Sequence, residues 1–218
     1  MTTKYLSLMT TPAVREAQRH YYAASRPIPE SAEPVSLTEE EMDFIRERDS
    51  FYIATVTETG WPYMQHRGGR AGFLKVLNPR LLAFADYKGN RQLLTTGNLA
   101  ANDRVALFLM DYPTRNRLKI MGHARVEDAR HHPELLAQLV DPEQQSKVER
   151  LIMIDVVAYD WNCSQYITPR YTTEQVETLV RPLQQRVAAL TEQVRELQAK
   201  LSPQVESAGP KDLAHPCQ

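Results

Sequence analysis

Apolar and polar residues alternate in short segments through the middle of the chain. Residues 51–57 alternate and end at a Glu-Thr-Gly turn, after which residues 61–67 read as the return arm of a hairpin. Further apolar segments follow, separated mostly by turns, at residues 72–77, 81–86, 104–112, 118–128 and 151–161. These six or seven short strands predict a closed or nearly closed antiparallel barrel.

Helical patterns flank and interrupt these strands. The expected helices cover residues 12–23, 38–48, 91–102 and 131–150. The first begins at a proline, and the second opens with Thr38 and Glu41, which form a capping-box pattern. Pro142 is expected to break the last one. Between the first two lies a Pro-rich connector, residues 25–36, which cannot be a helix or a central strand.

The last part of the chain carries a heptad repeat. Its apolar residues, at alternating spacings of 3 and 4, are Val180, Leu183, Val187, Leu190, Val194, Leu197 and Leu201. A helix that packs on its own domain and a helix that pairs with one in a partner subunit both fit, and the strict repeat favours pairing. Because proline is tolerated in the first turn of a helix, Pro182 predicts that the helix begins there.

These patterns divide the chain into four parts. Residues 1–44 hold the N-terminal helices and the connector, and residues 45–171 form the barrel. Residues 172–201 carry the C-terminal amphipathic or coiled-coil helix, and residues 202–218 form a flexible tail.

The composition limits the classes of partner and compartment that the protein can have. A hydrophobic content of 42% in 218 residues is enough for a sizeable core. The formal net charge of −1 gives no overall attraction to nucleic acid or to an anionic membrane, so an anion site has to be local. The two cysteines form no disulfide framework, and no stretch resembles a signal peptide or a membrane span. We therefore expect a cytoplasmic protein, and the sequence offers no convincing metal site.

Candidate chemistry gathers at strand ends. Residues 86–92, Asp-Tyr-Lys-Gly-Asn-Arg-Gln, stand between a strand and the start of a helix, where free N–H groups favour an anion. Arg91 has the paired donors that suit a phosphate. Residues 65–75 and 115–117 add basic side chains at other strand ends. Each group alone fits an ordinary solvated strand end, whereas together they suggest a phosphate-bearing ligand across the barrel.

The order of these segments resembles a known superfamily. The run "PYMQHRGG", "GFLKVL", "LAFADYKGNRQ", "GNLAANDRVALFLMDY" and "RLKIMGHARV" is similar to the pyridoxamine 5'-phosphate oxidase-like FMN-binding split β-barrels over residues 45–171. The later "DWNCSQYITPRY" resembles an uncharacterised flavoprotein branch. The resemblance implies a mainly β (α+β) fold: an antiparallel six-stranded split β-barrel with flanking helices and the C-terminal heptad helix. It also implies a homodimer with FMN at the subunit interface.

On the phosphate side, the resemblance implies contacts at the strand-to-helix turn. The superfamily's cationic and amide residues there match Asn90, Arg91 and Gln92. The strand before the turn lies beside the flavin ring, which points to Ala85 and Asp86. The vitamin B6 oxidase itself has a tandem Arg-Lys where this chain has Arg91 and Gln92, so the resemblance leaves the substrate open.

On the ring side, the resemblance implies five more contacts. The preceding strand pair supplies Arg67, Gly68 and Lys75 to the ring and the ribityl chain. Arg117 is the match for a residue that reaches the flavin of the other subunit, and Trp161 resembles a late tryptophan that flanks the cofactor.

The implied activity is that of an FMN-dependent oxidoreductase acting on an unknown small molecule, with no catalytic residue assigned. Two alternatives stay open, because a fold does not determine function. One is a non-enzymatic flavin- or haem-binding protein on the same barrel. The other is an assembly protein in which the heptad helix is the working part.

Overall fold

The computed structural model describes residues 2–24, 27–28, 35–161 and 163–206, with the backbone alone at 201–206. The chain divides into two compact units, Met1–Pro169 and Arg170–Gln218. The helices are α1 (Thr3–Met9), α2 (Pro12–Tyr22), α3 (Glu39–Arg46), α4 (Leu94–Ala101), the 3₁₀ helix η1 (Ala129–His131), α5 (Pro133–Leu139), α6 (Pro142–Gln145) and α7 (Thr173–Glu206). The strands are β1 (Ser50–Val56), β2 (Pro62–Gly68), β3 (Lys75–Asn78), β4 (Leu81–Tyr87), β5 (Arg104–Asp111), β6 (Asn116–Asp128) and β7 (Val148–Trp161).

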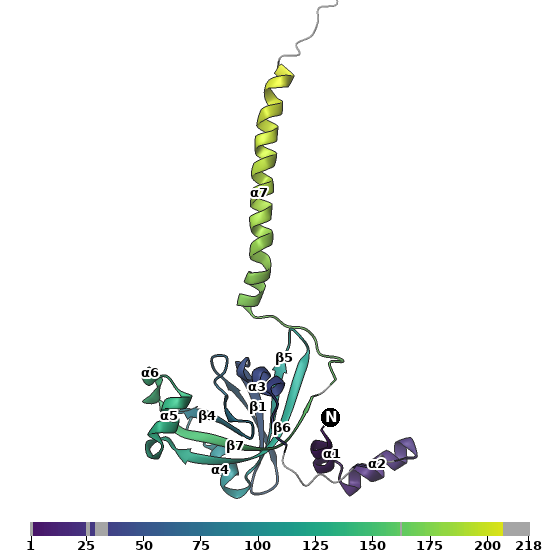
Figure 1. Ribbon diagram of the computed structural model, residues 1–218, viewed down its shortest axis with the longest axis vertical. Coiled ribbons are helices and arrows are strands. Elements are labelled where there is room, and N and C mark those ends of the chain that lie inside the picture. The colour runs from purple at the N-terminus through teal and green to yellow at the C-terminus, as the bar shows by residue number, and fades with distance from the viewer. Residues whose placement is uncertain (1, 25–26, 29–34, 162, 207–218) are drawn as a thin grey trace, which may run out of the picture. The chain divides into compact units, whose positions relative to one another are not determined.

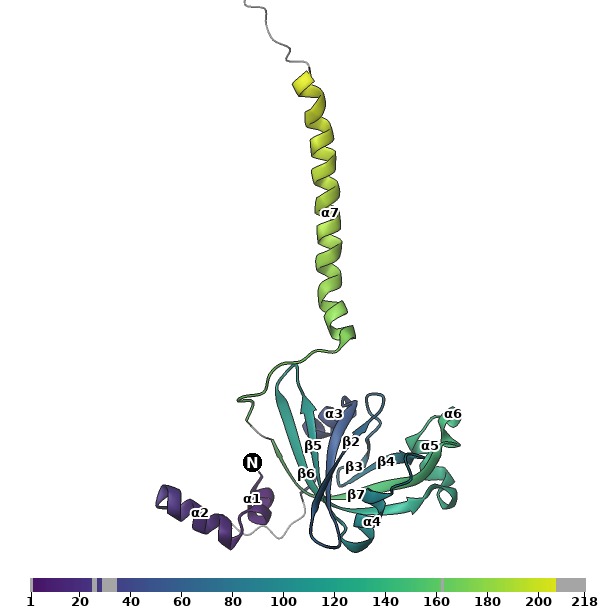
Figure 2. The same ribbon diagram turned by 180° about the vertical axis from the view of Figure 1, so that it is seen from behind.

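The described strands form one curled antiparallel sheet in the order β2-β1-β5-β6-β7-β4-β3 (Figures 1 and 2). This confirms the predicted mainly β, antiparallel fold. The sheet has seven strands where the resemblance implied six, and its shortest strand is β3, which spans four residues and pairs with β4 at one end of the strand order.

A bulge bends the two longest strands. β6 and β7 pair along most of their length, and their register shifts between Met121 and Gly122. A Cβ atom at Gly122 would lie 2.6 Å from the backbone oxygen of Asp155, so only glycine allows the strands to approach this closely. A bulge increases the local twist, which helps the sheet to curl around its core.

Two hydrophobic clusters bury β4 on both faces. In the larger cluster, Phe51 stacks on Phe73 with centroids 5.4 Å apart and meets Phe84 edge-on at 5.3 Å. The smaller cluster joins Ala83 of β4 to Leu139 of α5. Burial on both faces explains why the sequence of β4 is a continuous apolar run. Asp86 lies near the end of this strand and is only 7% exposed.

Helix α3 begins as predicted. The backbone N–H of Thr38 donates to Glu41 Oε2 at 2.9 Å, and the reciprocal bond of the capping box is also present. The other oxygen of Glu41, Oε1, accepts from Trp161 Nε1 at 2.6 Å. The buried carboxylate therefore caps the helix and joins it to the end of β7.

The remaining helices of the first unit agree with the sequence pattern only in part. α2 begins at Pro12 as expected, whereas α1 was not expected, and its Tyr5 is buried. The helix predicted over residues 131–150 breaks at Pro142 as expected, but its predicted extent is wrong. The chain instead forms η1, α5 and α6, interrupted before Pro142, and β7 begins at Val148.

The prediction that the last helix begins at Pro182 is wrong. α7 runs through Pro182, because the chain has a better start ten residues earlier. There the Thr172 hydroxyl accepts from the backbone N–H of Gln175 at 3.2 Å, and Gln175 Oε1 accepts from the backbone N–H of Thr172 at 2.9 Å. Within the described residues, no helix is both long and apolar enough to span a membrane.

Candidate functional site

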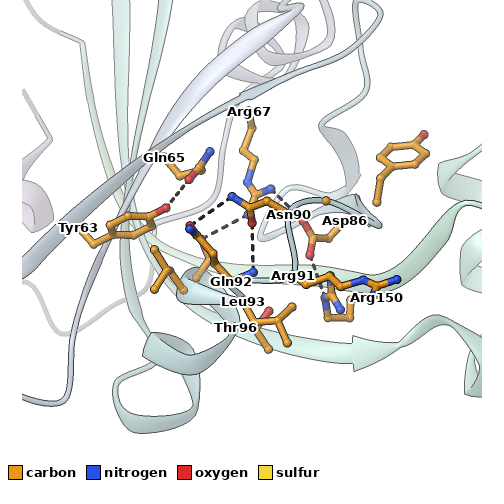
Figure 3. A pocket seen from close by; sticks show the side chains of 14 residues that line it. Tyr63, Gln65, Arg67, Asp86, Asn90, Arg91, Gln92, Leu93, Thr96 and Arg150 are labelled. Carbon is orange, nitrogen blue, oxygen red and sulfur yellow. Dashed lines mark hydrogen bonds and ion pairs between the residues drawn. The ribbon is translucent and has the colours of Figure 1, made fainter.

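A pocket of about 240 Å³ opens at the turn between β4 and α4 (Figure 3). Its walls come from β2, the end of β4, the turn, the first turn of α4 and the start of β7. The lining residues are Tyr63, Gln65, Arg67, Asp86, Tyr87, Gly89, Asn90, Arg91, Gln92, Leu93, Leu94, Thr95, Thr96 and Arg150. Most of them are polar, so the pocket suits a polar or charged ligand.

One carboxylate at the base of the pocket holds two arginines. Asp86 Oδ1 accepts from Arg67 Nη1 at 2.8 Å, and Asp86 Oδ2 accepts from Arg150 Nε at 2.9 Å (Figure 3). The strand pairing produces this arrangement, because Asp86 and Arg150 are direct partners in the β4–β7 register. Burial alone would lower the pKa of Arg150, but its bonds to Asp86 and Glu149 raise that pKa above the ordinary value.

Arg67 is held from two sides and still has an unused donor. Its Nη2 donates to the hydroxyl of Thr95 at 3.3 Å, in addition to the bond from Nη1 to Asp86. The Nε of Arg67 is buried and has no hydrogen-bond partner among the described residues. A buried N–H without a partner is costly, so this atom favours a ligand that brings an acceptor.

The turn itself is built from unusual backbone. Arg91 and Leu93 have positive φ values, 63° and 54°, in the left-handed region. Asn90 supports this turn, since its Oδ1 accepts from the backbone N–H of Gln92 at 3.1 Å. Arg91 is exposed at the pocket mouth and makes no ion pair with another described residue. Its guanidinium is therefore available to an incoming anion.

The first turn of α4 points more donors at the same space. Leu93 is the N-cap and has no side chain that could accept from the first N–H groups of the helix. Those groups belong to Leu94, Thr95 and Thr96, which all line the pocket. Asn98 fixes the helix to β1 through a buried bond of 2.8 Å from its Nδ2 to the hydroxyl of Thr55.

Charge distinguishes this pocket from the rest of the protein. Three arginines and one aspartate line it, a net charge of +2, whereas the whole chain carries −1. Guanidinium groups, uncapped helical N–H groups and threonine hydroxyls are the donors that bind phosphate in proteins. The arrangement is thus suited to a dianionic phosphate group.

Half of the predicted cofactor residues meet in this pocket. They are Arg67, Asp86, Asn90, Arg91 and Gln92. Asp86 has a role that the sequence did not suggest, because both of its oxygens are engaged by arginines.

The other five lie elsewhere in this chain, and their contact with a cofactor stays a prediction. Gly68 pairs with Ser50 on β1, and Lys75 pairs with Ala83 on β4. Ala85 packs against the smaller hydrophobic cluster, and Arg117 faces Met110 in the β5–β6 register. Trp161 packs edge-on against the ring of Phe44 at 4.8 Å and donates to Glu41.

Sequence reasoning missed Arg150, Tyr63, Thr95 and Thr96. Arg150 was assigned to the end of a helix, and only the pairing of β4 with β7 brings it to Asp86. The alternation of β2 was a usable signal, since Tyr63, Gln65 and Arg67 share one face of that strand and all line the pocket.

Comparison with known proteins agrees with the resemblance seen in the sequence. The family model for pyridoxamine 5'-phosphate oxidase matches residues 37–157. No curated protein matches the chain. Among solved structures, HupZ of Group A Streptococcus is 14% identical, with a TM-score of 0.45, and the match covers 62% of this chain and 99% of that one.

Two further solved structures are similar at comparable levels. A conserved hypothetical protein from Mycobacterium tuberculosis is 16% identical, with a TM-score of 0.47 and coverage of 66% and 96%. An FMN-binding protein from Syntrophomonas wolfei is 9% identical, with a TM-score of 0.40 and coverage of 57% and 87%. Since the family model spans more than half of the chain, this protein belongs to the pyridoxamine 5'-phosphate oxidase family.

Proposed function

We propose that the protein binds FMN and uses it as an oxidoreductase for a small molecule. The observation that carries this proposal is the pocket of net charge +2 at the β4–α4 turn, in a chain of this family. The bound flavin ring supplies hydride or electron transfer, and the protein supplies binding and orientation.

The donor set fits the single terminal phosphate of FMN. Arg67 brings a buried Nε with no partner among the described residues, and Arg91 brings an exposed guanidinium with no ion pair there. The first N–H groups of α4 complete the set. FMN is favoured over FAD because the sequence has no Gly-rich dinucleotide motif after a strand to hold a pyrophosphate.

Asp86 acts on the ligand through the arginines. Because both of its oxygens are occupied, it keeps Arg67 and Arg150 in fixed positions before the phosphate arrives. Such preorganisation lowers the entropy lost on binding. We assign Asp86 as a positioning residue, with Arg67 and Arg91 as the direct phosphate ligands.

The ring is proposed to lie between two subunits of a homodimer. In that arrangement Gly68, Lys75, Ala85, Arg117 and Trp161 are the candidate contacts to the ring and the ribityl chain. A cation such as Lys75 or Arg117 beside the ring would stabilise negative charge on it and raise its reduction potential.

An absorbance spectrum of the purified protein tests cofactor identity. We expect a flavin spectrum and, after release by heat, FMN as the cofactor found by chromatography. Recovery of FAD, a deazaflavin or haem would overturn the proposal. Bleaching of the flavin colour by NAD(P)H, followed by reoxidation in air, would support an enzyme over a non-enzymatic flavin-binding protein.

Variants test the phosphate site separately. Arg91→Ala removes a charged hydrogen bond worth about 1.5–3 kcal/mol, so the affinity for FMN should fall by roughly 10- to 100-fold. Arg104→Ala is the matched control, because Arg104 is exposed and does not line the pocket. Wild-type affinity in Arg91→Ala would mean that the phosphate binds elsewhere.

A further inference from the structure

Helix α7 carries a stripe of exposed apolar side chains along one face. The helix has 34 residues, which makes it about 50 Å long. The stripe occupies the a and d positions of the heptad repeat, where the side chains are 36–65% exposed. Its described members are Val176, Val180, Leu183, Val187, Leu190, Val194 and Leu197. In proteins, a helix gains most of its stability when it packs its apolar face against another surface, so α7 needs a partner surface.

We infer that α7 pairs with α7 of a second copy of this chain, in a parallel, in-register, two-stranded coiled coil. The choice of residues at the seam supports this occupant. Three successive a positions are Val180, Val187 and Val194, and the d positions that follow them are all leucine. A β-branched residue at a with leucine at d favours parallel dimers over trimers and tetramers.

Charges beside the seam are compatible with self-pairing. In a parallel, in-register dimer, each g residue faces an e residue of the other chain. The facing pairs are Leu179 with Gln184, Arg186 with Thr191, and Gln193 with Gln198. None brings like charges together, and none offers the strong charge pattern that would select a different protein as the partner.

The outer face of α7 also fits this arrangement. Glu192 and Arg195, at positions f and b, form an ion pair of 2.8 Å on the side away from the seam. Pro182 occupies position c, so the proline does not interrupt the series of a and d residues. In-register pairing aligns all seam layers, whereas a shift by one heptad would leave a and d residues uncovered at both ends.

Disulfide trapping in the full-length chain tests the geometry. With Cys163→Ser and Cys217→Ser as the background, a single cysteine is introduced at a d position near each end of the seam, as Leu183→Cys or Leu197→Cys. In a parallel, in-register dimer each d residue meets its own copy. Each variant should therefore cross-link with itself at least ~10-fold faster than the f-position control Gln185→Cys, because neighbouring thiols have a high effective concentration.

The other outcomes overturn the inference. Cross-linking only when the Leu183→Cys chain is mixed with a Val194→Cys chain would mean antiparallel pairing, because a residues face d residues in that arrangement. No cross-link in any of these variants, alone or mixed, would mean that α7 packs on its own domain or on another protein. Equal rates at d and f would mean random collision.

A second pair of variants shows that the seam causes the cross-link. Val187→Lys with Val194→Lys, added to Leu183→Cys, should abolish cross-linking, whereas Gln185→Lys with Glu192→Lys should preserve it. Persistence of the cross-link in the Val187→Lys and Val194→Lys variant would contradict the inference. None of these readouts depends on flavin, so the proposed function and the coiled coil succeed or fail separately.

Discussion

Replacing Asp86 by asparagine tests whether one carboxylate holds the pocket together. Asparagine has nearly the same volume and keeps one acceptor oxygen, but it removes the negative charge. Its NH₂ group would also face a guanidinium, which has only donors to offer. One of the two arginines therefore loses its acceptor, and both lose their counter-charge.

The expected magnitude follows from the exposure of these groups. A hydrogen bond to a charged group contributes about 1.5–3 kcal/mol, and breaking a fully buried ion pair costs about 3–5 kcal/mol. The side chains of Arg67 and Arg150 are 23% and 18% exposed, so water compensates part of the loss. We expect the free energy of unfolding to fall by about 2–3 kcal/mol and Tm to fall by about 5–10 °C.

Urea unfolding followed by tryptophan fluorescence measures the effect. The control is Asp155→Asn, which removes the negative charge from a 2.5 Å ion pair with Arg125. The side chains of Asp155 and Arg125 are 58% and 44% exposed. An exposed pair of this kind contributes about 1 kcal/mol or less. If Asp86→Asn destabilised the protein no more than Asp155→Asn does, the assignment of Asp86 as the support of both arginines would be refuted.

A double variant separates charge from packing. Adding Arg150→Met to Asp86→Asn removes one guanidinium that has lost its counter-charge, so part of the lost stability should return. A further loss, equal to the sum of the two single effects, would show instead that the side chains contribute independently.

Three further predictions concern the rest of the first unit. Glu41→Gln should lower the free energy of unfolding by about 1–2 kcal/mol, since the carboxylate caps α3 and binds Trp161. Burial raises the pKa of Glu41, but its hydrogen bonds lower that pKa by a larger amount, so the net shift is downward. The resulting stability is present above the ordinary pKa of 4.5 and is lost as pH falls through the lowered value. In urea titrations from pH 6 to 3, the free energy of unfolding should therefore change less steeply with pH in Glu41→Gln than in the wild type. Burial, with the nearby Glu41 charge, raises the pKa of Tyr159 to about 12. Its stabilising effect is complete below pH 10 and is lost as pH rises through about 12, so alkaline difference spectra should show Tyr159 among the tyrosines that ionise late. Gly97→Ala in α4 should stabilise the folded protein by roughly 0.5–1 kcal/mol, because nothing lies within 4 Å of the new methyl group. Gly122→Ala should destabilise it by roughly 1–3 kcal/mol, because a backbone oxygen of β7 lies 2.6 Å from the new methyl group. Thermal melts that gave both variants the same Tm would contradict this pair of predictions.

Features governed by near neighbours were accessible from the sequence. The capping box at Thr38 and Glu41 needs only residues three positions apart, and the break before Pro142 needs only the missing N–H of proline. The polar turn that lines the pocket was recognised for the same reason, since Asn90, Arg91 and Gln92 are neighbours in the sequence. The start of α7 was equally local, but the weight given to Pro182 hid the capping box at Thr172.

Features governed by strand register were not accessible. The partner of Asp86 is Arg150, 64 residues later, and a shift of one residue between β4 and β7 would turn that arginine to the other face. The contact from Trp161 to Glu41 joins residues 120 positions apart, so the sequence placed the tryptophan beside a cofactor without its helix partner. The sequence thus predicted three of the four charged residues that line the pocket, and only the strand pairing added Arg150.

Departures from ordinary local structure are concentrated at the β4–α4 turn. Two of the five described non-glycine residues with positive φ, Arg91 and Leu93, lie in it, the helix that follows has no side-chain cap, and Arg67 keeps a buried Nε without a described partner. Each of these lowers the stability of the ligand-free chain, and an anion at this turn would supply acceptors for the N–H groups and for Nε at once. Strain that a ligand relieves is typical of a binding site, whereas a purely structural turn gains nothing from it. A ligand that binds only the folded state stabilises it by about 2.7 kcal/mol at 100 times its Kd, so FMN should stabilise the wild-type chain far more than Arg91→Ala at the same concentration.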